Sequence, residues 1–254
     1  MVKFIKANGL GNDFVIIDGR ETPIILEKET VIKLADRKKG VGCDQVIYLK
    51  DSPKADVYMQ IFNPDGSEAE ACGNATRCVG YLLEKDLGLI ETKVGLLRSH
   101  KKEGGDVEVS LGESSILHEN IELDGVIRAM AVSVGNPHLV CFVESLEKFP
   151  VDRRGKELEY HPFFPNKTNV EFVQILGKGH LKAYVWERGA GRTLACGTGA
   201  AAAAKAYQEI TQEEVDVTVD LQGGSLKVSF ISKVQAVITG PVEINYYGQF
   251  DLSA

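Results

Sequence analysis

Two cysteines stand in the same three-residue motif at two places in the chain. Ala71-Cys72-Gly73 and Ala195-Cys196-Gly197 lie 124 positions apart, and each is followed by small and apolar residues. A thiolate can remove a proton from one face of a carbon atom while a thiol delivers a proton to the other face. We therefore predict that Cys72 and Cys196 form an acid–base pair acting at a single carbon.

Polar residues elsewhere repeat with the same spacing. The offset of 124 positions relates Asn12 to Asn136, Gln45 to Asn169, and Asn63 to Glu187. Internal symmetry of this kind predicts two similar halves. Amide side chains both donate and accept hydrogen bonds, so each half offers one cysteine and several groups suited to an amino-acid ligand. The third pair breaks the symmetry, because a carboxylate takes the place of an amide.

Both cysteines directly precede a predicted helix, one over residues 73–84 and one over 197–209. The first N–H groups of a helix have no internal partner and attract negative charge, so they stabilise a thiolate and bind a carboxylate. The glycine after each cysteine, Gly73 or Gly197, lets a ligand approach the backbone closely. We expect the carboxylate beside the reacting carbon to lie against these helix ends.

Charged residues near the second cysteine extend the predicted ligand. Arg188 carries a planar guanidinium suited to a second carboxylate, and Glu187 can pair with an ammonium group. His138 and Glu187 are also expected to tune the protonation of the thiols. These residues together indicate a diamino diacid as the substrate.

The elements that position these residues are predicted from periodicity and turn residues. Strands are expected over 3–6, 14–18, 46–50, 56–62, 106–111, 129–134, 139–143, 170–176, 181–186, 215–221, 226–231 and 235–239. Further helices are expected over 30–37 and 152–160, a turn over 63–67 and a linker over 112–125. The helices after the cysteines have no charged face over their first turns, which predicts burial on all sides.

The predicted fold class is α/β of the α+β type. We expect two pseudo-symmetric halves, each a curved and mostly antiparallel sheet wrapped around a central helix, with the active site in the cleft between them. The N-terminal half is predicted over residues 1–115, completed by 243–254, and the C-terminal half over 116–242.

Composition excludes several classes of function. The 254 residues carry a formal net charge of −7, with 44% hydrophobic and 26% charged residues, which is ordinary for a globular protein. The acidic balance argues against nucleic acid or a membrane surface as partner, and no apolar run approaches the ~20 residues of a membrane span. We therefore predict a cytoplasmic protein, a compartment in which its five cysteines are not expected to form stable disulfides.

Several segments in combination resemble one known family. They are Lys6-Ala7-Asn8-Gly9-Leu10-Gly11-Asn12-Asp13-Phe14, Asn63-Pro64-Asp65-Gly66-Ser67, Cys72-Gly73-Asn74-Ala75-Thr76-Arg77, Gly135-Asn136-Pro137-His138, Glu187-Arg188-Gly189-Ala190-Gly191 and Ala195-Cys196-Gly197-Thr198-Gly199. The chain is similar to the diaminopimelate epimerase family over nearly its whole length. The resemblance implies an isomerase that interconverts LL- and meso-2,6-diaminopimelate in lysine and peptidoglycan precursor synthesis. It also implies that the enzyme uses no cofactor and no metal and forms a homodimer.

The resemblance also assigns roles to individual residues. It implies that Cys72 and Cys196 are the acid–base pair and that His138 and Glu187 modulate their pKa values. The positions that match the family's substrate contacts are Asn12, Gln45, Asn63, Gly73, Asn74, Asn136, Asn169, Glu187, Arg188, Gly197 and Thr198.

Other functions compete with this interpretation. A two-thiol racemase acting on proline, hydroxyproline or histidine is disfavoured by Arg188 and Glu187, because a monocarboxylate needs no distal clamp. A non-catalytic amino-acid-binding protein is disfavoured because binding alone requires neither Cys72 nor Cys196. A zinc-stabilised structural domain is disfavoured because the cysteine and histidine spacings do not match common ligand patterns.

Overall fold

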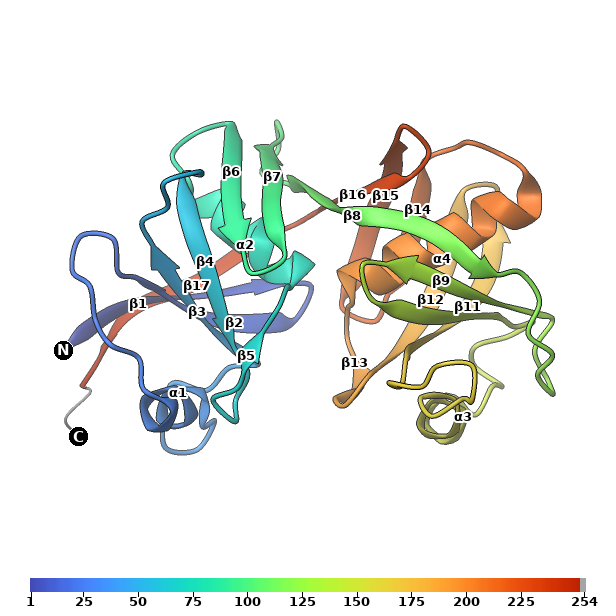
Figure 1. Ribbon diagram of the computed structural model, residues 1–254, viewed down its shortest axis with the longest axis horizontal. Coiled ribbons are helices and arrows are strands. Elements are labelled where there is room, and N and C mark those ends of the chain that lie inside the picture. Colours follow the sequence, from blue (N-terminus) through green and yellow to red (C-terminus); the bar gives the residue numbers. More distant parts are fainter. Residues whose placement is uncertain (252–254) are drawn as a thin grey trace. The chain divides into compact units, whose positions relative to one another are not determined.

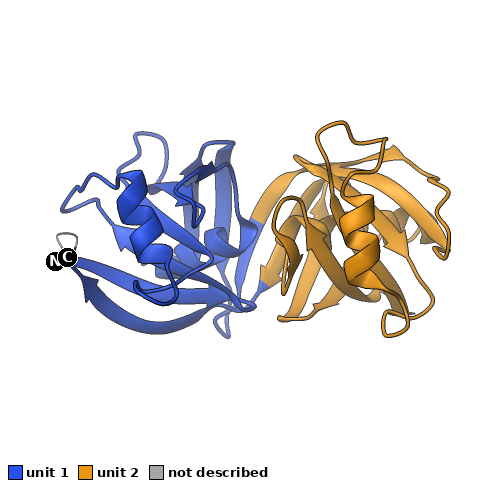
Figure 2. Ribbon diagram, turned by 90° about the horizontal axis from the view of Figure 1, so that it is seen from below, with its two compact units in different colours: residues 1–109, 240–254 blue, residues 110–239 orange. Residues whose placement is uncertain are grey.

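The computed structural model describes residues 1–251 and separates the chain into two compact units (Figures 1 and 2). Unit 1 comprises Met1–Val109 and the stretch that begins at Gly240, and unit 2 comprises Ser110–Thr239. The sequence predicted the boundaries between the two halves at residues 115/116 and 242/243. The last three residues of the predicted segment 243–254 lie outside the described residues.

Unit 1 is built mainly from strands. Its elements are β1 (Val2–Gly9), β2 (Asn12–Asp18), α1 (Lys28–Ala35), β3 (Gln45–Lys50), β4 (Val57–Phe62), β5 (Glu68–Ala69), α2 (Gly73–Leu82), β6 (Leu87–Thr92), β7 (Gly95–Lys101) and β17 (Glu243–Phe250). Strand β1 pairs antiparallel with β2 and with β17, and β2 runs parallel to β3. Strand β3 pairs antiparallel with β4, β4 runs parallel to β6, and β6 pairs antiparallel with β7.

Unit 2 repeats this succession of pairings. Its elements are β9 (Arg128–Val134), β10 (Pro137–Phe142), α3 (Val151–Leu158), β11 (Asn169–Gly177), β12 (His180–Glu187), β13 (Gly191–Thr193), α4 (Gly197–Thr211), β14 (Val217–Leu221), β15 (Gly224–Ile231) and β16 (Gln235–Gly240). Strands β9, β10, β11, β12, β14 and β15 pair in that order, alternately antiparallel and parallel. The chain therefore has a mixed α/β fold. In each unit a helix follows a short strand: α2 follows β5, and α4 follows β13.

The helices α2 and α4 lie in the cores of their units, as their sequences predicted. On α2, every residue from Asn74 to Gly80 is buried, and the helix contacts β1, β6 and β7. On α4, the run Ala200–Ala204 is fully buried, and the helix packs against strands β9 to β12, β14 and β15 (Figure 1). Small side chains allow this close approach of strands from several directions.

The predicted linker over residues 112–125 is wrong in its first half. Strand β8 (Val107–His118) runs through it, pairing first with β7 and then with β9. The polar residues that suggested a loop are satisfied within the sheet: Ser114 is buried, and its hydroxyl donates to the carbonyl oxygen of Val234 at 2.8 Å. Strands β6 and β7 were not predicted at all.

The four predicted helices are confirmed to within a few residues. The longest helix of the described chain, α4, has 15 residues, and none of the described helices could span a bilayer.

Candidate active site

In unit 1, the structure brings Cys72 together with two of the predicted amides. Cys72 is half-buried and occupies the residue directly before α2. Its Sγ lies 3.7 Å from Oδ1 of Asn12, the first residue of β2. Asn74, in the first turn of α2, donates from Nδ2 to the same oxygen at 3.2 Å. The cysteine thus faces a hydrogen-bond acceptor that belongs to a neighbouring strand.

Gln45 and Asn63 form a second pair in this unit. Gln45 begins β3, beside the start of β2, because the parallel register places it opposite Phe14. Its Nε2 donates to Oδ1 of Asn63 at 3.2 Å, in the turn 63–67 that the sequence predicted. Oε1 of Gln45 is buried and accepts no hydrogen bond from any described residue. Buried polar atoms are normally satisfied, so this oxygen is suited to a ligand N–H group.

In unit 2, Cys196 holds the equivalent place directly before α4, and only 8% of it is exposed. Its Sγ accepts a hydrogen bond from the backbone N–H of Gly199 at 3.4 Å and lies 3.4 Å from Oγ1 of Thr198. The amide of Asn136 donates in turn to that hydroxyl at 3.5 Å. Cys196 therefore caps its helix, whereas the side chain of Cys72 makes no capping bond to α2.

A buried histidine and a buried acid extend the contacts of Cys196, Thr198 and Asn136, which together we call the half-site at Cys196. His138 on β10 is fully buried, with Nε2 3.0 Å from Oδ1 of Asn136 and Nδ1 2.8 Å from Oε1 of Glu171 on β11. Glu171 is also fully buried. Sequence reasoning missed Glu171, although a lone acid between Val170 and Phe172 in an apolar strand was a signal of buried charge.

The surroundings of Cys196 favour its neutral form. Burial raises the pKa of the Cys196 thiol well above its usual value, and the nearby carboxylates Glu187 and Glu171 raise it further. Hydrogen bonds from Thr198 and Gly199 act in the opposite direction but do not outweigh these effects. Cys196 is therefore a thiol at neutral pH in this state.

Asn169, Glu187 and Arg188 gather where β11 begins and β12 ends. Oδ1 of Asn169 accepts from the backbone N–H of Arg188 at 2.9 Å, and its Nδ2 donates to the carbonyl of Pro137 at 3.1 Å. The Thr193 hydroxyl donates to Oε1 of Glu187 at 2.5 Å. The Arg188 residue is exposed. Its backbone is thus fixed, and Nη1 of its exposed side chain donates to the carbonyl oxygen of Asn166 at 3.4 Å. The other N–H groups of a guanidinium can bind a carboxylate.

The remaining cysteines are packing residues. Cys43, Cys78 and Cys141 are buried, and burial raises the pKa of Cys43 to about 11 and that of Cys78 to about 12. None of the five cysteines, all of which lie within the described residues, forms a disulfide. Within residues 1–251, no group of three or more histidine, cysteine or acidic side chains is placed to hold a metal ion.

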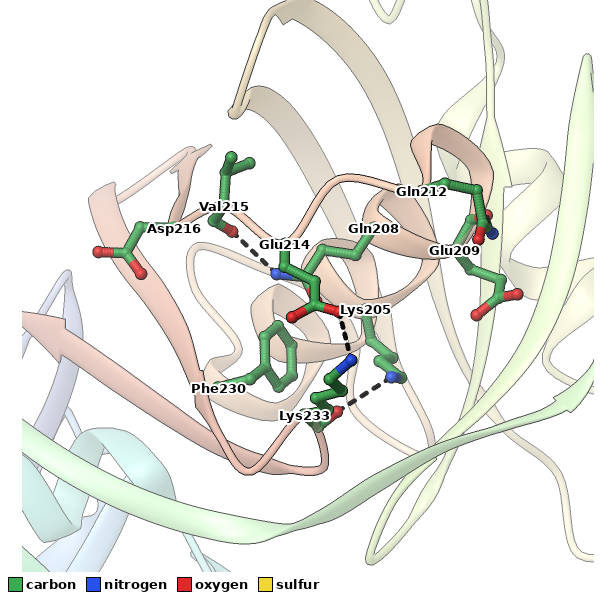
Figure 3. Close-up of a pocket in the computed structure, with 9 residues that line it drawn as sticks. All are labelled: Lys205, Gln208, Glu209, Gln212, Glu214, Val215, Asp216, Phe230 and Lys233. Atoms are coloured by element: carbon green, nitrogen blue, oxygen red, sulfur yellow. Dashed lines mark hydrogen bonds and ion pairs between the residues drawn. The ribbon is translucent and has the colours of Figure 1, made fainter.

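Unit 2 also carries a hollow of about 330 Å³ (Figure 3). It is lined by Lys205, Gln208, Glu209, Gln212, Glu214, Val215, Asp216, Phe230 and Lys233. Its polar groups bind one another, for example through the Lys233–Glu214 ion pair at 2.6 Å. The α4 residues that line the hollow begin at Lys205, eight residues after Gly197, which corresponds to a rise of about 12 Å along the helix. The hollow is therefore separate from the half-site at Cys196.

Solved structures share this fold. A Bacillus anthracis phenazine biosynthesis protein of the PhzF family has a TM-score of 0.74 and 18% identity, over 97% of this chain and 98% of its own. A probable proline racemase from Agrobacterium radiobacter has a TM-score of 0.74 and 16% identity, over 99% of this chain and 93% of its own. At such identities the likeness shows the fold alone. The chain thus has the mixed α/β fold of these two structures.

Sequence comparison narrows this fold to one family. The model of the family described as diaminopimelate epimerase matches residues 4–117 and 130–245. A Carboxydothermus hydrogenoformans protein named diaminopimelate epimerase is 41% identical, over 99% of this chain and 100% of its own length. A Sphingopyxis alaskensis protein of the same name is 42% identical, over 98% of this chain and 97% of its own. The chain belongs to the diaminopimelate epimerase family.

Proposed function

We propose that this chain interconverts LL- and meso-2,6-diaminopimelate, with Cys72 and Cys196 as the two acid–base groups. Diaminopimelate epimerase activity follows from the family and from full-length relatives of that name. The observation that supports the roles of the cysteines is their equivalent position. Each directly precedes the buried helix of its own unit, α2 or α4.

The chemistry needs two groups of opposite protonation at one α-carbon. A cysteine thiolate takes the α-proton, and the electron pair left on the carbon delocalises into the adjacent carboxylate. The thiol of the other cysteine then delivers its proton to the opposite face, so the two cysteines exchange protonation states in each turnover. The N–H groups at the starts of α2 and α4, at Gly73, Asn74, Gly197 and Thr198, stabilise the charge that develops on the carboxylate.

The remaining proposed contacts recognise the rest of the substrate. The exposed guanidinium of Arg188 suits the distal carboxylate, and Glu187 suits the distal ammonium group. The proposed amide contacts are Asn12, Gln45, Asn63, Asn136 and Asn169. We propose that the two units present these groups to one substrate molecule in a cleft, in a pseudo-symmetric arrangement that Glu187 and Arg188 break. His138 and Glu187 are proposed to tune the thiols.

Incubation of the reduced protein with LL-diaminopimelate in heavy water, followed by NMR, tests this proposal. We expect the meso isomer to form with one deuterium at the inverted α-carbon, because the delivered proton comes from an exchanged thiol. L-Proline, which lacks the distal groups, should neither exchange nor invert. Formation of the meso isomer without α-deuterium would exclude the thiol mechanism. Inversion of proline but not of LL-diaminopimelate would exclude diaminopimelate as the substrate.

Cysteine variants test the assignment of the acid–base pair. Cys72→Ser and Cys196→Ser should each lose nearly all epimerisation, by a factor of about 10³ or more, because serine is far too weak an acid to replace the thiol. The matched control Cys43→Ala removes a buried packing thiol and should retain activity. Full activity in either serine variant would contradict the two-base mechanism.

We further propose a cytoplasmic homodimer, on the resemblance to the family. Light scattering coupled to size-exclusion chromatography measures the mass directly. A mass near twice the 27.7 kDa of one chain supports the dimer, and a mass near that of one chain contradicts it.

A further inference from the structure

A chain of hydrogen bonds links four side chains around Cys72. Nη1 of Arg77 donates to Oδ1 of Asn74 at 3.0 Å, and Nδ2 of Asn74 donates to Oδ1 of Asn12 at 3.2 Å. Nδ2 of Asn12 then donates to Oδ2 of Asp44 at 3.0 Å. Every bond runs in the same direction, from the cation to the carboxylate. We call these four residues the amide relay.

The chemistry of its two ends fixes the orientation of both amides. A guanidinium can only donate hydrogen bonds, so the oxygen of Asn74 must face Arg77. An ionised carboxylate can only accept them, so the NH₂ group of Asn12 must face Asp44. Arg37 keeps that carboxylate paired, with Nη2 2.8 Å from Oδ1 of Asp44. The oxygen of Asn12 is therefore directed away from Asp44.

That oxygen is the one that lies 3.7 Å from Sγ of Cys72. A thiol can donate a hydrogen bond to it, whereas a thiolate would face a lone pair and be repelled. We propose that Asp44 is a positioning residue for Cys72: it holds the Asn12 carbonyl toward the sulfur and so keeps Cys72 protonated in the free protein. This deepens the proposed acid–base role of Cys72, but it concerns the protein without substrate.

Other groups of unit 1 act on the same thiol. The buried Arg77 guanidinium attracts a thiolate at Cys72, and Cys78 is the other titratable group that interacts with it on α2. Cys78 stays neutral, because burial raises its pKa to about 12. Asp44 reaches Cys72 through Asn12. Release of the Asn12 orientation therefore removes the repulsion from the Asn12 oxygen while the attraction of Arg77 remains, and Cys72 ionises more readily.

The arrangement in unit 2 differs in the direction of the hydrogen bond at sulfur. Cys196 accepts a bond from the backbone N–H of Gly199, and Asn136, the counterpart of Asn12, directs its NH₂ group toward Thr198. The two equivalent asparagines thus present opposite ends of their amides toward the cysteine side. Asp44 accounts for this difference on the side of Cys72.

Alkylation of Cys72 by iodoacetamide, followed by mass spectrometry across a range of pH, tests the proposal on the intact protein. In Asp44→Asn the new amide can donate as well as accept, so only the bond from Asn74 still holds the Asn12 oxygen. Asn12 can then turn its NH₂ group to the sulfur by giving up that single bond. We expect the midpoint pH of Cys72 alkylation to fall by about one unit, which is an approximately tenfold faster reaction at fixed pH below the midpoint. Looser packing alone would change the rate at every pH without moving the midpoint.

A double-mutant cycle shows whether Asp44 acts through Asn12. Asn12→Ala removes the acceptor and should lower the midpoint by itself, and adding Asp44→Asn to it should then produce no further shift. Arg37→Gln, which leaves the Asp44–Asn12 bond in place, is the matched control and should keep the midpoint of the unaltered protein. The proposal is overturned by an unchanged or raised midpoint in Asp44→Asn, or by an equal shift in both backgrounds, which would indicate charge acting through space. Should Asp44→Asn not fold, an unchanged midpoint in Asn12→Ala overturns it alone.

Discussion

Glu171 is a buried acid whose charge acts on the second cysteine. Glu171→Gln keeps polar atoms for the hydrogen bond with His138 but removes the negative charge that helps burial to raise the pKa of Cys196. We expect the midpoint pH of Cys196 alkylation to fall, by up to about one unit. The control Glu209→Gln changes an acid near the C-terminal end of α4, thirteen residues after Cys196, and should leave the midpoint alone. A midpoint that stays constant in Glu171→Gln would show that burial alone governs this thiol.

The site residues that repeat in the sequence are held in place by other residues that do not repeat. The offset of 124 positions singled out Asn12 and Asn136 because both are equivalent in the two halves. Asp44 lies 32 residues from Asn12, and Glu171 lies 33 residues from His138. These contacts depend on parallel strand pairing, which brings distant segments together and leaves no local periodicity. Asp44 and Glu171 also have no counterparts of the same type in the other half, so symmetry could not reveal them.

Glycine at the start of α4 is required by the close approach of that helix to β11. A Cβ on Gly199 would lie 2.7 Å from Oε1 of Glu171 and 3.3 Å from Cβ of Cys196. Gly199→Ala should therefore shift the first turn of α4, lower the free energy of unfolding by about 1–3 kcal/mol and reduce epimerisation strongly. Urea denaturation and the activity assay measure both effects.

Gly177 provides the matched control for that substitution. It lies at the end of β11, and a Cβ there would meet no atom within 4 Å. Gly177→Ala should leave stability and activity close to those of the unaltered protein. Equal behaviour of the two alanine variants would mean that α4 tolerates a displacement at its first turn.

Asp13 joins three segments of unit 1 through charge. Its carboxylate pairs with Lys6 on β1 at 2.5 Å and with Arg37, which follows α1, at 2.6 Å. Burial raises the pKa of Asp13, but hydrogen bonds from Arg37 and Lys6 outweigh burial and hold the pKa far below its usual value. A depressed pKa contributes stability above the unfolded value of about 3.9, and that stability is lost as the pH falls below it.

The pH dependence of urea denaturation between pH 7 and pH 2 measures this contribution. We expect the free energy of unfolding to fall below about pH 4, with a slope from this one group of up to about 1.4 kcal/mol per pH unit. Asp13→Asn should flatten that slope and destabilise the protein at neutral pH, because Lys6 is then buried without its partner. The control Asp152→Asn replaces an exposed carboxylate and should change neither the acid slope nor the stability at neutral pH. An undiminished acid slope in Asp13→Asn would assign the effect to other carboxylates.

Local pattern predicted the helices well and the extent of the strands less well. Helices such as α2 and α4 are defined by contiguous runs of residues, so their start after a cysteine was visible in the sequence. Strand β8 was hidden because its second half contains glycine, glutamate and serine, and its stability comes from pairing with β9 and from the Ser114–Val234 bond. Such partners lie far along the chain, which is why 112–125 was predicted to be a linker.

The C-terminal strand β17 belongs to unit 1, although it follows the whole of unit 2 in the sequence. β17 pairs with β1 over most of its length, and a Cβ at Gly248 would lie 2.4 Å from the Phe4 ring. Unit 1 is therefore discontinuous in sequence, whereas unit 2 is one continuous segment. The two units should accordingly differ in whether they survive separation.

Unit 2 should fold when residues 110–239 are expressed alone. The segment holds its own apolar core, including Phe172, Leu139 and Leu158, and the strands against which α4 packs, β9 to β12, β14 and β15, belong to this segment. A fragment of about 130 residues buries enough surface to fold independently. We expect cooperative thermal unfolding by circular dichroism and dispersed NMR amide signals, but no epimerisation, because Cys72 belongs to unit 1. A fragment that unfolds without cooperativity would show that unit 2 depends on unit 1 for its stability, and the two units would then count as one folding domain.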